Sequence, residues 1–579
     1  MSDAMDLLRS VKDRTDETEF YTPLPDGYQL GKVKYVAIFG TVISGLGKGI
    51  FSSSLAKILK DKGLRVSPIK LEGYLNIDSG TLNPFRHGEV FVLDDGLETD
   101  MDLGTYERML DQDLGRANFA TSGQIFSTVL NKERAGSFLG RDVQMIPHVT
   151  GEVKMRLREL AMQTRADVVF IEVGGTVGDI ENSFFIEAIR ELRYEEGEQS
   201  VVCVALTYVL APPALGEQKS KAAQLGMKRL MAYGILPDII ACRAEEPVLD
   251  KVRQKLSLYS NVPIRRVFSM HDLPSIYLLP NALREAGIDS EVVQLLGLGG
   301  RVNSALEAKA VSLWNTFADR LLKSDNRRIR IGVTGKYTSL RDSYASIIKA
   351  LEHAGVANDV AVDIDWIDTT DITDETAAEA LADVDGIIVP GGFGVRGTAG
   401  KIACIGYARR NKLPYLGICL GFQMAVVEYA RNVCGLADAD STELSPDCET
   451  PVIDILPEQK KIEGLGGNMR LGGQDVEITP GTLIAELFEG AEQIRQRFRH
   501  RYEVDPTYIE TLESGGLVFS GRHPVHPIMQ VLELPRDVHP YFLAAQFHPE
   551  LTSRPLRPQP MFVGLVAAAL QRKNAAVTC

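Results

Sequence analysis

Residues 36–49 read Val36-Ala-Ile-Phe-Gly40-Thr-Val-Ile-Ser44-Gly45-Leu46-Gly47-Lys48-Gly49. The apolar run 35–39 predicts a buried parallel strand, and residues 50–60 have helical spacing. A strand, a glycine-rich turn and a helix form a phosphate cradle, because backbone N–H groups, the positive helix end and a lysine meet the anion there. Gly49 stands where a Mg²⁺-binding Ser or Thr usually follows the lysine, so acidic residues elsewhere must hold the ion. The alternative is a tight turn with a solvated lysine.

Size and composition narrow the class of protein. At 579 residues, two or three domains are expected. The chain has 63 basic and 77 acidic residues, a net charge of −14, which disfavours a general nucleic-acid or anionic-membrane surface. Seven scattered cysteines without a CxxC pair predict neither a disulfide framework nor a zinc site. With no signal peptide and no apolar run of about 18 residues, we expect a cytoplasmic enzyme without a membrane or nucleic-acid partner.

Apolar runs alternate with polar-faced helical segments along most of the chain. The runs are 66–69, 168–173, 201–209 and 239–242, and then 330–334, 387–389 and 414–419. This alternation predicts an α/β fold with two doubly wound, mostly parallel sheets, whose sites lie at the carboxyl ends of strands. The predicted domain order is an N-terminal extension 1–33, a first domain 34–300, a linker 301–327, a second domain 328–573 and a tail 574–579. Within it, we expect a short helix at 5–12 in the extension and a helical stretch at 304–323 in the linker.

Carboxylates gather at two places in the predicted first domain. Residues 94–107 are dense in Asp and Glu, a pattern that is usually a solvated face. Glu172 ends a hydrophobic run and precedes Gly-Gly, where burial is costly unless the carboxylate pairs or binds metal. Because Mg²⁺ takes carboxylate, phosphate and water oxygens, Asp102 and Glu172 can replace the missing loop hydroxyl.

A basic group follows, with the sequence Gly216-Glu-Gln-Lys219-Ser-Lys221-Ala-Ala-Gln224 and Lys255 further on. Two lysines at i and i+2 on a loop suit a second polyphosphate. The alternative is a set of ordinary surface lysines.

The predicted second domain carries a Gly-x-Cys-x-Gly elbow, Leu416-Gly417-Ile-Cys419-Leu-Gly421. A sharp strand-to-helix turn exposes the thiol at a helix N-terminus, which lowers its pKa and favours the thiolate. The segment Gln546-Phe-His548-Pro-Glu550 places His548 and Glu550 on one face of an extended backbone. A lone Cys is more often a core residue and a lone His-Pro-Glu a loop. Together they supply nucleophile, base and orienting carboxylate.

Five motifs together resemble the CTP synthase family. They are Gly45-Leu-Gly-Lys-Gly49, Tyr74-Leu-Asn-Ile-Asp78-Ser-Gly-Thr, His87-Gly-Glu-Val-Phe-Val92, Asp102-Leu-Gly-Thr-Tyr-Glu-Arg108 and Glu172-Val-Gly-Gly-Thr-Val-Gly-Asp-Ile-Glu181. With the second domain, the resemblance covers roughly residues 34–568. It implies that ATP phosphorylates the uracil 4-oxygen of UTP and that ammonia then displaces phosphate, the last step of pyrimidine nucleotide synthesis.

The resemblance implies roles for the amidoligase residues. Catalysis would use Lys48 and Lys70. ATP would be bound by Gly45, Leu46, Gly47, Lys48, Gly49, Asp102, His271, Asp272 and Leu273. UTP and the feedback inhibitor CTP would be bound by Ser44, Asp179, Ile180, Glu181, Lys219, Ser220, Lys221, Gln224 and Lys255. Mg²⁺ would be held by Asp102 and Glu172, and an ammonia gate would be formed by His87 and Val90.

The second domain resembles a class I glutamine amidotransferase. In that family's scheme Cys419 is the nucleophile, His548 the general base and acid, and Glu550 the residue that orients the ring. Glutamine would be held by Gly392, Leu420, Gly421, Phe422, Gln423, Glu443 and Arg501, with oxyanion N–H groups from Gly392 and Leu420. Arg396 and the loop 466–471 resemble parts tied to GTP activation and to a lid, and the segment 457–464 before that loop is shorter than in many relatives. The resemblance also implies a homotetramer and leaves filaments open.

Several positions depart from the family pattern, and two alternative functions stay open. Phe39 and Thr41 replace a Thr and a Gly, Glu72-Gly73 replaces Asp-Pro, and Thr105 replaces His. One alternative is another P-loop amidoligase that amidates a carboxylate, which the lysine cluster at 219–255 argues against. The other is a non-catalytic, filament-forming or regulatory relative, which the intact Cys-His-Glu set argues against.

Overall fold

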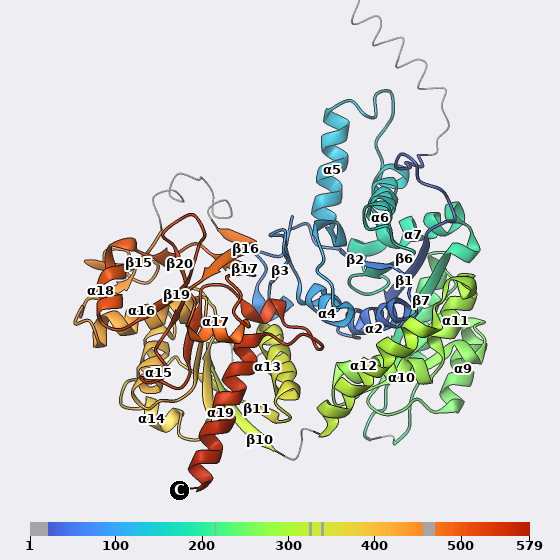
Figure 1. Cartoon of the computed structure of the whole chain (residues 1–579). Helices are drawn as coiled ribbons and strands as arrows, with labels where there is room; N and C mark the ends of the chain where they lie inside the picture. The colour runs from blue at the N-terminus through green and yellow to red at the C-terminus, as the bar shows by residue number, and fades with distance from the viewer. Residues whose placement is uncertain (1–20, 215, 324–326, 337–340, 456–468, 579) are drawn as a thin grey trace, which may run out of the picture. The chain divides into compact units, whose positions relative to one another are not determined.

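The computed structural model describes residues 21–214, 216–323, 327–336, 341–455 and 469–578. They form two compact units with separate central sheets (Figure 1). The first unit comprises the described residues of 1–81 and 105–313, and the second those of 82–104 and 314–579. The helix predicted at 5–12, the short segment 457–464 and the first part of the loop 466–471 lie outside the described residues.

The sheet of the first unit is wholly parallel. Its strands in spatial order are β5 (Phe119–Thr121), β2 (Val66–Glu72), β6 (Val168–Val173), β1 (Lys34–Gly40), β7 (Val201–Tyr208), β8 (Ile239–Ala244) and β9 (Val267–His271). The central strand β1 is buried on both faces, which explains its continuous apolar run. The predicted parallel α/β fold of this part is confirmed.

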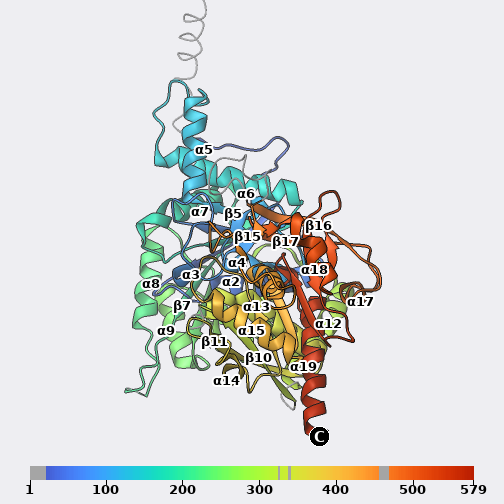
Figure 2. The same ribbon diagram turned by 90° about the vertical axis from the view of Figure 1, so that its left-hand side faces the viewer.

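Helices cover both faces of this sheet. They are α2 (Lys48–Asp61), α4 (Met101–Leu110), α5 (Ser122–Arg134), α6 (Thr150–Thr164), α7 (Ser183–Glu196), α8 (Lys221–Ala232), α9 (Asp250–Ser260), α10 (Leu279–Glu285) and α11 (Ile288–Leu295). Tyr35, Ala37 and Phe39 pack into a core with α6 and α7, so the alternation along β1 turns Val36 and Ile38 to the other face. Figure 1 shows α2 and α10 on the side away from α6 and α7, and Figure 2 shows α2 apart from α6 in a second view.

Residues 21–33 of the predicted N-terminal extension pack against the first unit. The buried guanidinium of Arg158 donates to the carbonyl of Pro23 at 3.1 Å and pairs with Glu195 and Glu196. The amide of Gly31 donates to the Glu196 carboxylate at 2.8 Å. This part of the extension is therefore integrated into the domain surface.

The sheet of the second unit has a parallel half and an antiparallel half. Its strands in order are β11 (Ala361–Asp368), β10 (Arg328–Gly335), β12 (Gly386–Val389), β13 (Tyr415–Ile418), β21 (Phe542–Ala545), β20 (Met529–Glu533), β19 (Val518–Arg522), β16 (Arg470–Ile478) and β17 (Gln493–His500). The pairings from β11 to β21 are parallel, and those from β21 to β17 are antiparallel. The antiparallel extension goes beyond the doubly wound sheet predicted from sequence.

The second unit also contains its own helices and two small sheets. The helices are α13 (Ala345–Ala357), α14 (Ala377–Ala380), α15 (Thr398–Arg410), α16 (Leu420–Asn432), α17 (Leu483–Leu487), α18 (Ile509–Ser514) and α19 (Pro560–Thr578). One small sheet contains β14 (Ala439–Ser441), β15 (Thr450–Asp454) and β18 (Glu503–Val504). The predicted helical stretch of the linker is helix α12 (Ser304–Lys323).

Residues 82–104 pack with the second unit, although the predicted first domain 34–300 includes them. They contain α3 (Pro84–His87) and a hairpin of β3 (Phe91–Val92) and β4 (Glu98–Thr99). The hairpin is attached to β16 and β17, because the Gly473 amide donates to the Asp94 carbonyl at 2.7 Å and Arg495 pairs with the Asp94 carboxylate.

Two further features concern membrane-spanning helices and cysteine pairing. Among the described residues, no helix combines the length and apolar character needed to cross a bilayer. The six described cysteines are free thiols.

Candidate functional site

The turn between β1 and α2 depends on glycines with left-handed backbone conformations. Gly45 has φ 72° and Gly47 has φ 79°, and a Cβ on Gly47 would come within 2.9 Å of an Nη atom of Arg243. The Nζ of Lys48 donates to the carbonyl of Gly175 at 2.8 Å. The predicted strand, turn and helix are present, and the turn meets the segment after β6 at the carboxyl edge of the sheet.

A lysine and two glutamates form a buried group at the same edge. Lys70 and Glu172 are paired in register on β2 and β6. The Lys70 Nζ lies 3.1 Å from Glu72 Oε1 and 3.8 Å from Glu172 Oε1. Glu172 is 1% exposed, and its Oε2 accepts a hydrogen bond from the Tyr106 hydroxyl at 3.0 Å. These contacts offset the cost of burying its charge.

The assignment of Asp102 and Glu172 as Mg²⁺ ligands stays a prediction. The oriented carboxylate of Glu172 is a hard oxygen donor of the kind that Mg²⁺ takes. Asp102 lies in the first turn of α4, in the segment grouped with the second unit. In the part of the chain that the structure describes, no three His, Cys, Asp or Glu residues form a metal cluster. Two carboxylates with phosphate and water oxygens remain the predicted set.

The predicted ATP-binding segment 271–273 is connected to the phosphate loop by an arginine that the sequence reasoning missed. Arg243, at the end of β8, pairs with Asp272 at 2.7 Å and donates to the Leu46 carbonyl at 3.4 Å. His271 ends β9, and its buried Nδ1 has no hydrogen-bond partner among the described residues. Leu273 follows in the same loop. The position of Arg243 directly after the apolar run 239–242 was the signal that could have identified it.

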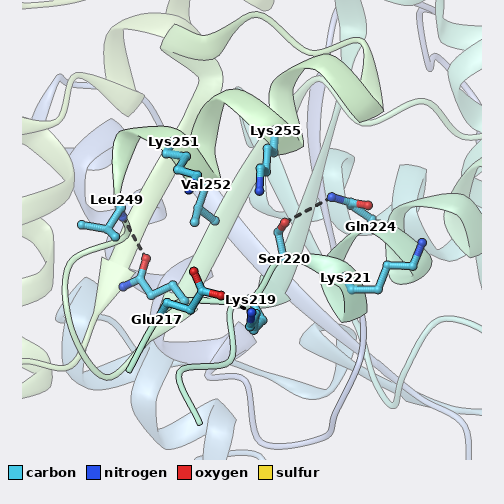
Figure 3. A pocket seen from close by; sticks show the side chains of 10 residues that line it. Glu217, Lys219, Ser220, Lys221, Gln224, Leu249, Lys251, Val252 and Lys255 are labelled. Atoms are coloured by element: carbon cyan, nitrogen blue, oxygen red, sulfur yellow. Dashed lines mark hydrogen bonds and ion pairs between the residues drawn. The ribbon is translucent and has the colours of Figure 1, made fainter. Parts of the chain in front are cut away.

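The predicted lysine cluster lines one cavity of about 380 Å³ (Figure 3). Its walls are formed by Glu217, Gln218, Lys219, Ser220, Lys221, Gln224, Leu249, Lys251, Val252 and Lys255. Figure 3 shows Lys255 on α9 directed toward Ser220, whose hydroxyl accepts a hydrogen bond from Gln224 at 3.1 Å. Lys219 pairs with Glu217, and this hydrogen bond, with the nearby lysine charges, lowers the pKa of Glu217. Glu217 and Lys251 were not predicted.

The other predicted uridine-nucleotide residues lie outside this cavity's lining. Ser44 is exposed in the phosphate loop, and Asp179, Ile180 and Glu181 are exposed in the turn after β6. Asp179 accepts a hydrogen bond from the Thr176 amide at 2.8 Å. A Cβ on Gly178 would come within 2.5 Å of an Nη atom of Arg229, so this turn touches α8, which begins at the cavity.

The residues that depart from the family pattern, apart from Thr105, fit their local surroundings. Phe39 is buried in the core. Thr41 is also buried, and a Cβ on Gly226 of α8 would come within 2.6 Å of it, so glycine there makes room for the threonine. Glu72 pairs with Lys70. A Cβ on Gly73 would come within 3.1 Å of the Glu181 Cβ. Thr105 is buried in α4, with nothing in the structure to explain its identity.

In the second unit, Cys419 lies between β13 and α16 with φ 51° and ψ −100°, a strained elbow conformation. The flanking glycines are sterically required. A Cβ on Gly417 would come within 2.3 Å of the Tyr415 hydroxyl oxygen, and one on Gly421 within 2.1 Å of the Val389 carbonyl oxygen. The thiol is 6% exposed and lies 3.6 Å from the Arg499 carbonyl.

His548 and Glu550 adopt the geometry of a base and its orienting carboxylate. Nδ1 of the ring lies 2.7 Å from Glu550 Oε1. The other ring nitrogen, Nε2, is buried without a hydrogen-bond partner in the described part of the chain. A Cβ on Gly391 would lie 3.8 Å from Nε2 and 3.6 Å from the Cys419 Cβ, so the ring and the thiol flank the same glycine. Burial lowers the pKa of His548, but Glu550 and Cys419 raise it by more, to about 10.

The predicted glutamine-binding residues make contacts within the second unit. Gln423 donates to the Tyr502 carbonyl at 3.0 Å, and Glu443 accepts from the Gly394 amide at 3.0 Å. The pKa of Tyr502 is raised by burial and by Glu443 and is lowered by Arg501, so both charges lie close to its hydroxyl. The side chains of Leu420 and Phe422 pack into the core, which leaves their backbone groups for binding. Gly392 lies beside Leu420, and Gly421 lies in the first turn of α16.

The remaining predicted residues lie at the edge of this unit. His87 ends α3 and is exposed, and Val90 is partly buried. Their segment is anchored by Glu89, whose carboxylate accepts from the Ser346 amide at 2.9 Å. Arg396 donates to the Lys336 carbonyl at 3.0 Å. Sequence reasoning missed Gln546, whose amide lies 3.7 Å from the Cys419 sulfur.

Comparisons with known proteins agree with both halves of this description. A family model described as the CTP synthase N-terminus matches residues 34–298, and one described as class I glutamine amidotransferase matches residues 339–568. A CTP synthase from Thermococcus gammatolerans is 49% identical over 541 residues, which are 93% of this chain and 99% of the relative. One from Thermus thermophilus is 47% identical over 542 residues, 93% of this chain and 97% of the relative. The solved glutaminase domain of Trypanosoma brucei CTPS with bound acivicin is 37% identical, covers 42% of this chain and 94% of its own, and has a TM-score of 0.39.

Proposed function

The chain belongs to the CTP synthase family, and from this premise we propose how its residues divide the reaction. The enzyme is a glutamine-hydrolysing C–N ligase that aminates UTP to CTP with ATP and with ammonia from glutamine. We assign glutamine hydrolysis to Cys419 in the second unit. Recognition of UTP is assigned to the lysine-lined cavity of the first.

Glutamine hydrolysis follows from the arrangement around the elbow. The Cys419 thiolate attacks the side-chain amide carbon of glutamine, and the resulting oxyanion accepts hydrogen bonds from the N–H groups of Gly392 and Leu420. The His548 imidazolium transfers its Nε2 proton to the departing nitrogen, which leaves as ammonia. Neutral His548 then takes a proton from water as the water attacks the thioester, and glutamate leaves with the thiol restored. Glu550 holds the ring in the required orientation.

Amination is assigned to the carboxyl edge of the first sheet. Lys219, Lys221 and Lys255 suit the triphosphate of UTP, because their ammonium groups and that of Lys251 line one cavity. Lys48 and Lys70 would stabilise the phosphoryl group during transfer from ATP to the uracil 4-oxygen. Ammonia then attacks C4, and the oxygen leaves with phosphate. Asp102 and Glu172 would hold Mg²⁺, which neutralises phosphate charge when bound.

We extend the proposal to regulation and assembly on the strength of the family alone. CTP would inhibit through Asp179, Ile180 and Glu181, with Ser44 shared by UTP. GTP would activate glutamine hydrolysis near Arg396, and His87 and Val90 would gate ammonia. We also propose a homotetramer, with filaments as a further possible assembly. Free thiols at all six described cysteines suit a reducing compartment, which supports a cytoplasmic location.

The observation that carries the glutaminase assignment is the strained Cys419 elbow beside a buried imidazole held at 2.7 Å by Glu550. The test is CTP formation by the Cys419→Ala variant, measured with glutamine and separately with ammonium salt. Glutamine-dependent synthesis should fall by at least about 10³-fold, because the covalent route is lost, while the ammonia-dependent rate stays within about twofold. Equal loss of both rates would contradict the division between the two units.

A further inference from the structure

One buried lysine of the second unit has no part in the steps above. Lys401 lies in the first turn of α15 and is 3% exposed. Its Nζ donates to the carbonyl of Pro390 at 2.8 Å. Within the described ranges of the chain, no carboxylate forms an ion pair with it. An ammonium group without a counter-ion is unfavourable in a protein interior, so its retention there indicates a specific contribution.

The backbone that Lys401 holds leads directly into the proposed oxyanion site. Pro390 precedes Gly391 and Gly392. A Cβ on Gly391 would lie 3.6 Å from the Cys419 Cβ, whereas one on Gly392 would lie 3.7 Å from the Lys401 Nζ. Gly391 therefore lies beside the nucleophile Cys419, and Gly392 lies beside the ammonium group of Lys401. A Cβ on Gly391 would also lie 3.0 Å from the His548 Cε1, which is tighter than ordinary packing, whereas the contacts of a Cβ on Gly392 would be ordinary.

Two further contacts hold the other end of the same segment. The Nζ of Lys336 donates to the Phe393 carbonyl, and the Gly394 amide donates to Glu443 at 3.0 Å. The carbonyl groups of Pro390 and Phe393 are thus each bound by an ammonium group. The Gly392 N–H belongs to the peptide group that it shares with the Gly391 carbonyl, and this group lies between the two anchored peptide groups 390–391 and 393–394. Anchoring the chain on both sides therefore limits how far the Gly392 N–H can rotate.

We propose that Lys401 is a positioning residue for glutamine hydrolysis, which holds the Pro390 carbonyl so that the Gly392 N–H meets the developing oxyanion. The positive charge of Lys401, which lies beside the segment 390–394, adds electrostatic stabilisation of that oxyanion. Donors that are oriented before the reaction stabilise developing charge without reorganising, which is why a fixed loop accelerates this step. The inference rests on the proposed glutaminase role of Cys419.

The electrostatic environment of Lys401 supports this role. Burial lowers the pKa of Lys401, the charge of Lys336 lowers it further, and Cys419 raises it, which leaves it at about 7. Lys401 and Cys419 are therefore close enough for the charge of one to act on the other.

The test replaces the ammonium group with an apolar chain of similar length. Lys401→Met should lower kcat of glutamine-dependent CTP synthesis about 30-fold, less than the loss of an oxyanion donor itself, while the KM for glutamine stays within about threefold. The ammonia-dependent rate should stay within about twofold, because the first unit is unchanged. Lys401→Gln, which keeps a donor without charge, should lie between wild type and Lys401→Met. If Lys401→Met does not fold, the Gln variant is judged by the same criteria.

Lys573→Met is the matched control. Lys573 lies on α19, outside the proposed site, and its Nζ pairs with the Asp385 carboxylate at 3.4 Å. A kcat within about threefold of wild type, a rise in KM alone, or a parallel loss of the ammonia-dependent rate would each overturn the inference. Cys419→Ala is assayed beside these variants. If Cys419→Ala keeps glutamine-dependent synthesis, the proposed function itself fails. If Cys419→Ala loses this activity but Lys401→Met keeps the wild-type rate, only the inference about Lys401 fails.

Discussion

Glu98 and Arg499 form an ion pair in the second unit, with the Arg499 Nε 2.7 Å from Glu98 Oε1. The pair is largely buried. The backbone carbonyl of Arg499 lies 3.6 Å from the Cys419 sulfur, and its guanidinium lies 5.1 Å from the centre of the Phe393 ring. A residue from the hairpin 91–99 is thus linked through one arginine to both the nucleophile and the oxyanion loop.

Breaking this pair should impair glutamine hydrolysis selectively. Glu98→Gln removes the charge that pairs with the Arg499 guanidinium at 2.7 Å, and we expect kcat/KM for glutamine to fall about tenfold and the melting temperature to fall by several degrees. The ammonia-dependent rate should change by less than about twofold. Steady-state assays with both nitrogen sources and thermal melts measure these effects. Glu477→Gln, which breaks the exposed pair with Arg522, is the control, and equal effects of the two variants would refute the link.

The lysine-lined cavity predicts selective effects on UTP. Lys255→Met should raise the KM for UTP about tenfold, because one charge-assisted contact to the triphosphate is lost, while glutaminase activity is unchanged. Lys228→Met removes an equal charge from the exposed face of α8, where the ammonium lies over the Tyr259 ring, and should leave the KM for UTP within about twofold. Indistinguishable UTP titrations for the two variants would show that net charge, not the cavity, governs binding.

The hydrogen bond from Tyr106 to Glu172 predicts a response to Mg²⁺. Tyr106→Phe removes the hydroxyl that orients the carboxylate, so the Mg²⁺ concentration for half-maximal ammonia-dependent synthesis should rise about tenfold at fixed ATP. Glutamine hydrolysis measured alone should not change. An unaltered Mg²⁺ titration would remove Glu172 from the proposed ligand pair. Isothermal titration with Mg²⁺ and a nonhydrolysable ATP analogue gives the same readout without turnover.

The raised pKa of His548 predicts how stability depends on pH. The ring titrates near 6.5 in an unfolded chain but at about 10 in the folded one. Its contribution to stability is therefore fully present below about pH 6.5 and is lost as the pH rises toward 10. Glu550→Gln removes the charge that most raises this pKa, so the decline of stability between pH 6.5 and 10 should become shallower. Urea unfolding of wild type and variant at several pH values measures it, and equal slopes would contradict the coupling.

Local sequence patterns predicted the two elements that carry the proposed chemistry. The phosphate loop and the cysteine elbow were predictable because each requires glycines at positions fixed by a strand-to-helix turn. The cavity at 219–255 was also anticipated as a lysine cluster, although Glu217 and Lys251 in its walls were not. These features depend on short stretches of chain.

Features that depend on distant contacts were not predictable. Asp94 and Arg495 are 401 residues apart, so the packing of 82–104 with the second unit has no local signature. The antiparallel strand β17 carries three arginines among its eight residues, unlike the apolar runs that indicated the parallel strands. Lys401 could have been noticed, because helical spacing places it on the buried side of α15 with Cys404, Ile405 and Ala408.

The central claim is that nitrogen released at Cys419 becomes the amino group of CTP. The most direct test incubates the enzyme with ATP, UTP, glutamine labelled with ¹⁵N at its side-chain amide, and equimolar unlabelled ammonium. Mass spectrometry then measures the ¹⁵N content of the CTP that forms. Wild type should yield mostly ¹⁵N-labelled CTP, and Cys419→Ala should yield only unlabelled CTP. Labelled CTP from the variant, or wild-type CTP without label, would contradict the account.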